Sequence, residues 1–115
     1  MISRQWCGLA RANQAQNYVE HLRRHTFPAL REIPGFVDAS ILSRTVANGV
    51  EFLIVTRWDS LEAITQFAGS DPEMAVVPAE VVAMMVEYDR RVKHFEVMTD
   101  EQDRAPLNLI GRDDA

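Results

Sequence analysis

The sequence contains a single cysteine, Cys7, among 115 residues. One cysteine excludes an internal disulfide and is consistent with a reducing compartment. Because Cys7 falls in a predicted strand, we interpret it as a small buried hydrophobe rather than as a nucleophile. The sequence also lacks a CxxC motif, a phosphate-binding loop and a Ser-His-Asp arrangement, so thiol-redox, kinase and hydrolase functions have no support.

Strong basic charge and long apolar runs are missing as well. The net charge is −5 and the pI is near 5.1, and no basic stripe runs along the chain, so we expect no nucleic-acid partner. No stretch approaches the ~20 apolar residues of a membrane span, and the N-terminus does not resemble a signal peptide. We therefore expect a cytoplasmic protein without membrane contact. The 47% apolar and 25% charged content is ordinary for one globular domain.

The most informative pattern is a β-hairpin around Asn48-Gly49, a dipeptide that favours type I′ turns. It predicts strands over residues 39–47 and 50–58, with Thr45 opposite Phe52. One face then carries Phe52, Ile54 and Trp58, and the other carries Leu42, Leu53 and Val55. Because both faces are apolar, we expect helices to cover one face and a second copy of the chain to cover the other.

The remaining periodicities predict the order β-α-β-β-α-β. Period-two segments indicate a first strand at residues 2–9 and a last strand at 88–97. Helical spacing predicts a first helix with Asn13 as its cap and a kink or restart at Pro28. A second helix is expected after Asp59 as its cap, followed by short helical pieces within 74–85.

This order predicts an α+β, ferredoxin-like fold with an antiparallel four-stranded sheet and both helices on one face. Two such sheets packed back to back form a dimeric α+β barrel. The predicted domain covers residues 1–97. Residues 98–115 form an acidic C-terminal tail that is either mobile or packed on the partner subunit.

Three segments carry a family resemblance. Pro34-Gly35-Phe36 precedes the hairpin, the RWDSLEA segment at 57–63 follows it, and the KHFEV segment at 93–97 ends the domain. In this order they resemble the antibiotic biosynthesis monooxygenase (ABM) family of dimeric α+β barrels, over roughly residues 1–97. The resemblance implies a homodimer and suggests a cofactor-independent monooxygenase that oxidises a small aromatic molecule, a phenol, a quinol or a polyketide.

The same superfamily includes heme-degrading enzymes. A chain that resembles this heme-degrading branch is expected to have an asparagine in strand one, a tryptophan in helix two and a histidine about ten residues later. Here helix two has Phe67, the histidine position falls near Val77 or Pro78, and strand one has no asparagine. We therefore reject heme degradation and expect neither a cofactor nor a metal.

Oxidation of a phenol without a cofactor requires an apolar cavity, a group that takes the phenolic proton, and exclusion of water. His25, at the edge of the first helix's apolar stripe, and His94, in the last strand, are the candidate catalytic bases. The alternatives are a partly exposed or core histidine bonded to the backbone for His25 and an interface histidine for His94. His21 and His25 have i, i+4 spacing, but His21 is expected to face partly outward and no third metal ligand is evident.

Substrate binding is predicted for Trp6, Tyr88, Arg57 and Trp58. The aromatic rings suit stacking on a flat substrate, although Trp58 can instead fill the junction between its strand and the next helix. Arg57, like Arg4 and Arg44, alternates with apolar residues within a strand. A buried arginine there needs a carboxylate partner or an anionic ligand. The alternative is an arginine at the sheet edge or at an interface.

Two other functions remain open from the sequence. One is a non-catalytic dimer that binds a small apolar molecule or serves as a structural module. The other is an isomerase or lyase on the same barrel. The feature that separates a catalytic from a non-catalytic protein is whether a histidine and an aromatic side chain point into one closed cavity.

Overall fold

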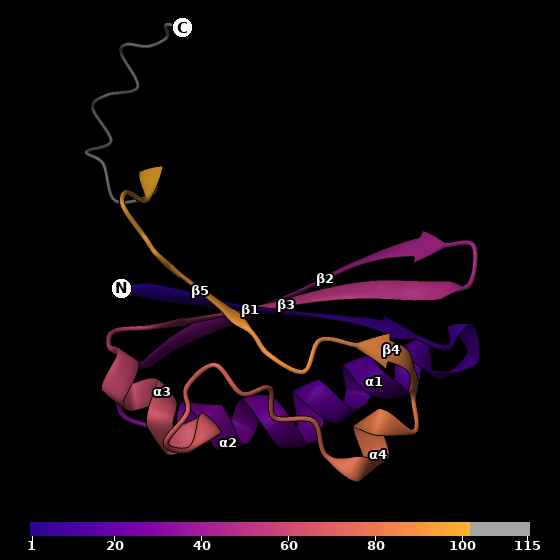
Figure 1. Ribbon diagram of the computed structural model, residues 1–115, viewed down its shortest axis with the longest axis horizontal. Helices are drawn as coiled ribbons and strands as arrows, with labels where there is room; N and C mark the ends of the chain where they lie inside the picture. Colours follow the sequence, from indigo (N-terminus) through magenta and orange to yellow (C-terminus); the bar gives the residue numbers. More distant parts are fainter. Residues whose placement is uncertain (102–115) are drawn as a thin grey trace, which may run out of the picture.

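Residues 1–101 are described by a computed structural model, in which five strands form one antiparallel sheet (Figure 1). The strand order is β2-β3-β1-β4, and β5 lies beside the other half of the same β1 edge. The strands are β1 (Ile2–Ala10), β2 (Phe36–Val46), β3 (Gly49–Trp58), β4 (Met85–Tyr88) and β5 (Lys93–Glu96). The predicted α+β, ferredoxin-like fold is confirmed, with a fifth strand because the last edge strand is in two parts.

The helices all lie on one side of this sheet, below the strands in Figure 1. The first helical segment runs without a break from a 3₁₀ turn through an α-helix, a π-helical turn and a second α-helix. The helical elements are η1 (Ala12–Gln14), α1 (Ala15–His21), η2 (Leu22–Thr26), α2 (Phe27–Arg31), α3 (Leu61–Ala68) and α4 (Ala79–Val82). None of these helices is long and apolar enough to cross a membrane. A cytoplasmic location stays a prediction.

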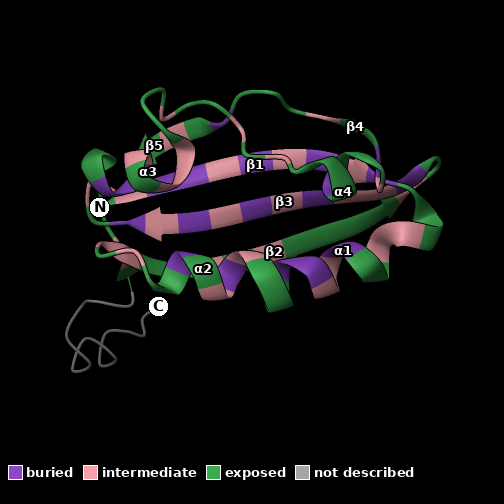
Figure 2. Cartoon of the chain, turned by 90° about the horizontal axis from the view of Figure 1, so that it is seen from below, coloured by how far each residue is buried: buried purple, intermediate pink, exposed green. Residues whose placement is uncertain are grey.

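Alternation along β1 and β3 decides which side chains face the helices. Trp6 lies opposite Ile54 and Arg4 lies opposite Thr56, and all four are buried on the helix side. Figure 2 shows the resulting alternation of buried and partly buried bands along β3. On the other face, Leu42 of β2 remains exposed. The predicted separation of the two faces is confirmed.

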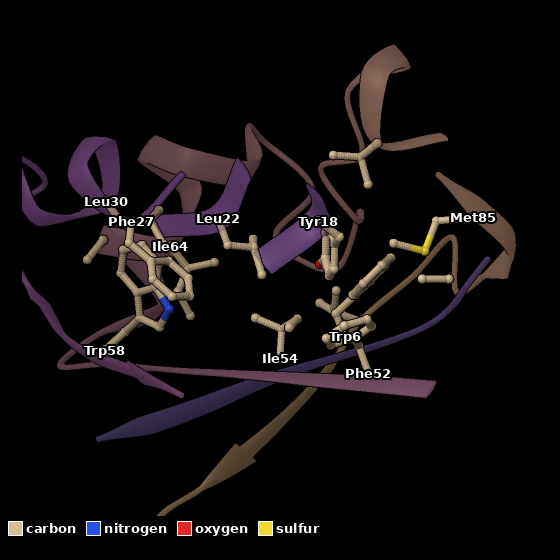
Figure 3. Close-up of a cluster of buried hydrophobic side chains, with 14 residues drawn as sticks. Trp6, Tyr18, Leu22, Phe27, Leu30, Phe52, Ile54, Trp58, Ile64 and Met85 are labelled. Atoms are coloured by element: carbon tan, nitrogen blue, oxygen red, sulfur yellow. The ribbon is translucent and has the colours of Figure 1, made fainter. Parts of the chain in front are cut away.

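The apolar core lies between the sheet and the helices in two groups, which Figure 3 shows at opposite ends of the layer. Trp58 is at the centre of one group and Trp6 is part of the other. Leu22 and Ile54 lie between them. The labelled members are Trp6, Tyr18, Leu22, Phe27, Leu30, Phe52, Ile54, Trp58, Ile64 and Met85.

The predicted hairpin exists, but its turn is one residue earlier than expected. Val46 pairs with Gly49, so Ala47 and Asn48 form the turn, and Ser43 rather than Thr45 lies opposite Phe52. The partner of each β3 residue moves by two positions in β2. A shift by two preserves the side of each side chain, so the predicted faces remain correct.

Helix boundaries differ from the predicted caps. Asn13 lies inside the 3₁₀ turn and does not cap α1, which has no side-chain cap. Ser60 rather than Asp59 caps α3, because its hydroxyl accepts a hydrogen bond from the Ala63 backbone N–H at 3.1 Å. Pro28 lies at the second position of α2, where it has no N–H to leave unpaired, and the predicted irregularity takes the form of the π turn before it.

The predicted last strand is divided. β4 begins at Met85, which was expected to be helical, and β5 begins at Lys93 after an irregular segment. Within residues 74–85 only α4 is helical, and the chain from 69 to 78, here called the strap, has no helix or strand but a turn near Pro72 and a bridge from Met74 to Arg91. The predicted tail, residues 98–115, lies almost entirely outside the described residues.

Gly8 allows the Trp6 ring to lie along the sheet. A Cβ atom at Gly8 would come within 2.4 Å of the Trp6 ring, a distance that side chains do not tolerate. We expect Gly8→Ala to displace the indole and lower the free energy of unfolding by about 1–3 kcal/mol. Tryptophan fluorescence and urea denaturation measure both effects. Cys7→Ala, on the opposite face of β1, is the control, and a Gly8→Ala protein with unchanged emission would contradict the prediction.

Candidate functional site

A cavity lies between the sheet and the first helical segment, with the strap as its side wall. The cavity opens to solvent at its mouth, and its narrow interior has a volume of about 60 Å³. By that measure it holds roughly five water molecules, about the volume of one aromatic ring. The lining comprises Arg4, Trp6, Tyr18, His21, Leu22, Thr26, Phe27, Leu30, Ile54, Thr56, Phe67, Val76, Val77, Pro78 and Val81.

Among the described residues, Arg4 is the only one that places a permanent charge on the floor of this cavity. It projects from β1 and is 6% exposed, and burial lowers the pKa of its guanidinium to about 10. Nη2 donates to the Met74 carbonyl at 2.7 Å and to the Pro72 carbonyl at 3.4 Å, and the guanidinium lies 5.4 Å from the centre of the Phe67 ring. Nε is enclosed and has no hydrogen-bond partner.

His94 lies opposite Arg4 in the β1–β5 pair, on the same face of the sheet. Its Nε2 is enclosed and has no hydrogen-bond partner. Burial first, and the nearby Arg4 charge second, lower the pKa of His94, so the imidazole is neutral at pH 7. His94 is therefore next to the cavity floor, but it is not part of the cavity lining.

The opposite wall comes from the helices. The Tyr18 ring packs against Phe52 at 4.9 Å between ring centres, and burial raises the pKa of its hydroxyl. His21 is 9% exposed, and its Nδ1 lies 3.8 Å from the Glu80 carboxylate on α4. His21 was expected to face partly outward, and that prediction is wrong. The cavity thus has a buried imidazole from the helices opposite a guanidinium from the sheet.

The predicted histidine His25 is placed differently. It is exposed on the π turn with its ring centre 5.4 Å from that of His21, and Thr26 takes the place in the cavity wall. Among residues 1–101 no group of three histidine, cysteine or carboxylate side chains can hold a metal. His21 is therefore buried in the cavity wall while its neighbour His25 faces solvent, and the absence of a metal stays a prediction.

Of the predicted substrate-binding residues, Trp6 alone lines the cavity. Its Nε1 donates to the Asp89 carbonyl at 2.8 Å, which fixes the ring beside Tyr18. Tyr88 lies behind Trp6, 6.4 Å between ring centres, outside the lining. Trp58 is fully buried in the core, which agrees with its alternative role at the strand–helix junction.

Arg57 faces away from the cavity. It lies on the other face of the sheet and forms ion pairs with Asp38 at 2.7 Å and Asp100 at 2.8 Å. These carboxylates raise the pKa of Arg57, and the guanidinium lowers the pKa of Asp38. Arg57 is therefore a residue of the internal strand β3 that is paired with carboxylates on the face away from the helices, and an interface role for it stays a prediction.

Sequence reasoning missed His21, Tyr18 and Phe67 as cavity residues. Tyr18 was assigned to the apolar stripe of the helix, which is correct but says nothing of a cavity. A signal for Arg4 did exist, because it alternates with apolar residues in β1 and has no nearby acidic residue in the sequence.

The depressed pKa of His94 predicts a pH-dependent stability. The unfolded chain binds a proton at this histidine near pH ~6.5, whereas the folded protein binds it only at lower pH. Stability is therefore fully present above about pH 6.5 and falls as the pH drops toward the folded-state pKa. We expect His94→Gln to lose less stability than the wild type between about pH 7.5 and about pH 5 in urea unfolding. Equal losses would contradict the prediction.

Comparison with known proteins agrees with the family resemblance seen in the sequence. The family model of antibiotic biosynthesis monooxygenases matches residues 10–77, more than half of the chain. A search of curated proteins gives no significant match.

Solved structures share the fold. A variant of MhuD with two manganese protoporphyrin IX molecules bound per active site is 21% identical, with a TM-score of 0.62 over 87% of this chain and 97% of that one. MhuD is a heme degrader of Mycobacterium tuberculosis. A Deinococcus radiodurans protein assigned to the antibiotic biosynthesis monooxygenases is 18% identical, with a TM-score of 0.60 over 87% of this chain and 95% of that one.

A Bacillus cereus protein with the same assignment is 19% identical, with a TM-score of 0.58 over 86% of this chain and 92% of that one. At these identities the structural likeness concerns the fold. Together with the family model and the ordered PGF, RWDSLEA and KHFEV segments, it supports one conclusion. The chain belongs to the antibiotic biosynthesis monooxygenase family.

Proposed function

We propose that the protein is a cofactor-independent oxygenase that oxidises a small phenol or hydroquinone in the cavity under its helices. The observation that carries this proposal is the combination of a buried histidine, His21, and an aromatic wall in one cavity. The volume fits one aromatic ring, which favours a monocyclic substrate over a large polyketide. Trp6, Tyr18 and Phe67 supply the flat apolar surfaces against which such a ring packs.

The proposed reaction needs no external reductant. A phenol and one O₂ give a quinone and one water, so the four electrons that reduce O₂ all come from the substrate. Loss of the phenolic proton is the step that makes the ring electron-rich enough to react. We assign the proton transfer to His21, which lines the cavity, and retain His94 as the second candidate because its neutral imidazole lies beside Arg4.

The lining of this cavity does not match the heme site that the family resemblance describes. MhuD binds porphyrins, but here Val77 and Pro78 stand near the position of the expected histidine. The cavity wall includes Phe67, Val77 and Pro78. By the family resemblance, these residues stand where the heme-degrading enzymes have their heme-contacting side chains. We derive no step through heme, and the rejection of heme degradation stays a prediction.

We also propose that two copies of the chain pack sheet to sheet. The face opposite the helices carries Leu42 and Phe95, both about half exposed, and Leu53 lies beside Leu42 in the sheet. No described helix or strand covers this face (Figure 1), and the described segment 97–100 contacts only one end of it, at Arg57. The same face carries ion pairs such as Arg44–Glu51, and exposed apolar side chains among polar ones are typical of a protein interface.

Oxygen consumption with a panel of monocyclic phenols and hydroquinones tests the function, in the presence of a chelator and without flavin. We expect turnover above the protein-free rate, and a decrease in kcat of about 10²–10⁴-fold for His21→Gln. His25→Gln is the matched control, since that exposed side chain lies one turn further on. Uptake that is unchanged in both His21→Gln and His94→Gln would exclude catalysis and favour a protein that only binds a small molecule.

A further inference from the structure

Arg4 is a buried cation whose charge no described acidic residue balances. It forms no ion pair within residues 1–101, and no aspartate or glutamate from that part of the chain lines the cavity. The other arginines of the sheet behave differently, because Arg57 has Asp38 and Asp100 and Arg44 has Glu51. An unpaired charge that is 94% buried is costly unless something else compensates it.

The groups that do contact Arg4 satisfy hydrogen bonds but not charge. Its Nη2 bonds only to two neutral carbonyls, those of Pro72 and Met74, and Phe67 contributes the weak attraction of a ring face. Nε remains without a partner. Nη1 makes no hydrogen bond to the described residues either, yet unlike Nε it is not completely enclosed. One edge of the guanidinium is thus still able to donate.

The surroundings of Arg4 are suited to an anionic ligand. The residue is part of the cavity lining, together with the rings of Trp6 and Phe67. The other ionisable groups that face the cavity, His21 and Tyr18, bring no negative charge near pH 7, and burial raises the pKa of Tyr18. His94, opposite Arg4 in the sheet, is neutral as well. The cavity therefore presents an unbalanced positive charge next to aromatic walls.

We propose that Arg4 is the anchor for an anionic oxygen group on the aromatic ligand of this cavity, a carboxylate or a phenolate. A carboxylate accepts N–H bonds from the open edge of a guanidinium, and the contact is a charge-assisted hydrogen bond in a site with little water. The inference rests on the proposed function for the identity of the site, but it concerns binding and does not require turnover.

Matched ligand pairs test the proposal with the whole chain. Isothermal titration calorimetry compares benzoate with benzamide, which has the same shape but no charge, and 4-nitrophenolate with nitrobenzene. We expect the wild type to bind at least one anion about tenfold or more tightly than its neutral partner. The pair that shows the preference identifies the carboxylate or the phenolate. Equal affinity within both pairs, or no binding of any of the four, would overturn the proposal.

Arginine variants assign the preference to one residue. Arg4→Met removes the charge and should abolish the preference for the anion, whereas Arg4→Lys should keep part of it. Arg11→Met removes the same charge from an exposed arginine outside the cavity and should leave the preference unchanged. A merely structural Arg4, which only holds the strap, would weaken binding of charged and neutral ligands alike.

The outcomes separate this inference from the proposed function. A preference for the anion that depends on Arg4, without any oxygen uptake, supports the anchor and excludes the oxygenase. Oxygen uptake with no preference in either ligand pair does the reverse. If Arg4→Met does not fold, Arg4→Lys and the wild-type ligand pairs still decide, because a wild type without a preference for the anion overturns the anchor.

Discussion

Replacement of Trp58 by alanine should lower the free energy of unfolding by about 3–5 kcal/mol, the largest single-residue effect we expect in this chain. Trp58 has no exposed surface and packs against Phe36, with 5.2 Å between ring centres, and against Phe67, at 6.2 Å. Alanine removes the indole and leaves a cavity that the surrounding strands cannot close. Since single domains are stable by only about 5–15 kcal/mol, the variant should unfold at much lower denaturant concentration.

Trp58→Phe separates packing from hydrogen bonding. The indole Nε1 donates to the Thr56 hydroxyl at 2.9 Å, and phenylalanine loses this bond while retaining most of the ring contacts. We expect it to cost less than the alanine variant, with the lost bond contributing about 1 kcal/mol. Urea denaturation followed by circular dichroism measures both variants. A Trp58→Ala protein within about 1 kcal/mol of the wild type would show that the residue is not part of the core.

The faces of the sheet could be predicted from the sequence, but the turn of its hairpin could not. Side-chain alternation is a local property, so Phe52 and Ile54 were correctly predicted to share one face, which the structure shows to be the helix side. The Asn48-Gly49 pattern indicated the wrong pair of turn residues because Gly49 has a different role. A Cβ atom there would lie 2.2 Å from the Ala10 carbonyl oxygen of β1. The glycine is needed for a contact between distant segments, which a local pattern does not reveal.

The cavity was harder to predict because one helical irregularity changes its wall. Tyr18, Leu22 and His25 share one side of a regular α-helix. The π turn at Leu22–Thr26 holds an additional residue, and each residue in an α-helix rotates the chain by about 100°. Thr26 therefore takes the position expected for His25, and His25 is exposed. Trp6 lines the cavity because β1 is regular up to Gly8, and for the same reason Arg4 faces the cavity; substrate binding by Trp6 stays a prediction.

The proposed dimer leads to the second large effect. Leu42→Asp places a charge on the uncovered sheet face, in the edge strand β2, where the partner sheet would have to bury it. We expect the dissociation constant of the dimer to rise by on the order of 100-fold or more, because an unpaired buried charge costs several kcal/mol. The stability of the separate subunit should change little, since Leu42 is 48% exposed there.

Leu61→Asp is the matched control for this experiment. Leu61 is 46% exposed, nearly the same as Leu42, but it lies at the start of α3 on the helix side, where an aspartate is favourable. Sedimentation velocity at micromolar concentration should show a dimer for the wild type and Leu61→Asp and a monomer for Leu42→Asp. Phe95→Asp, on the same face as Leu42, should also dissociate the dimer. A wild type that sediments as a monomer would leave the sheet face without its proposed partner, and a dimeric Leu42→Asp would place the interface elsewhere on the molecule.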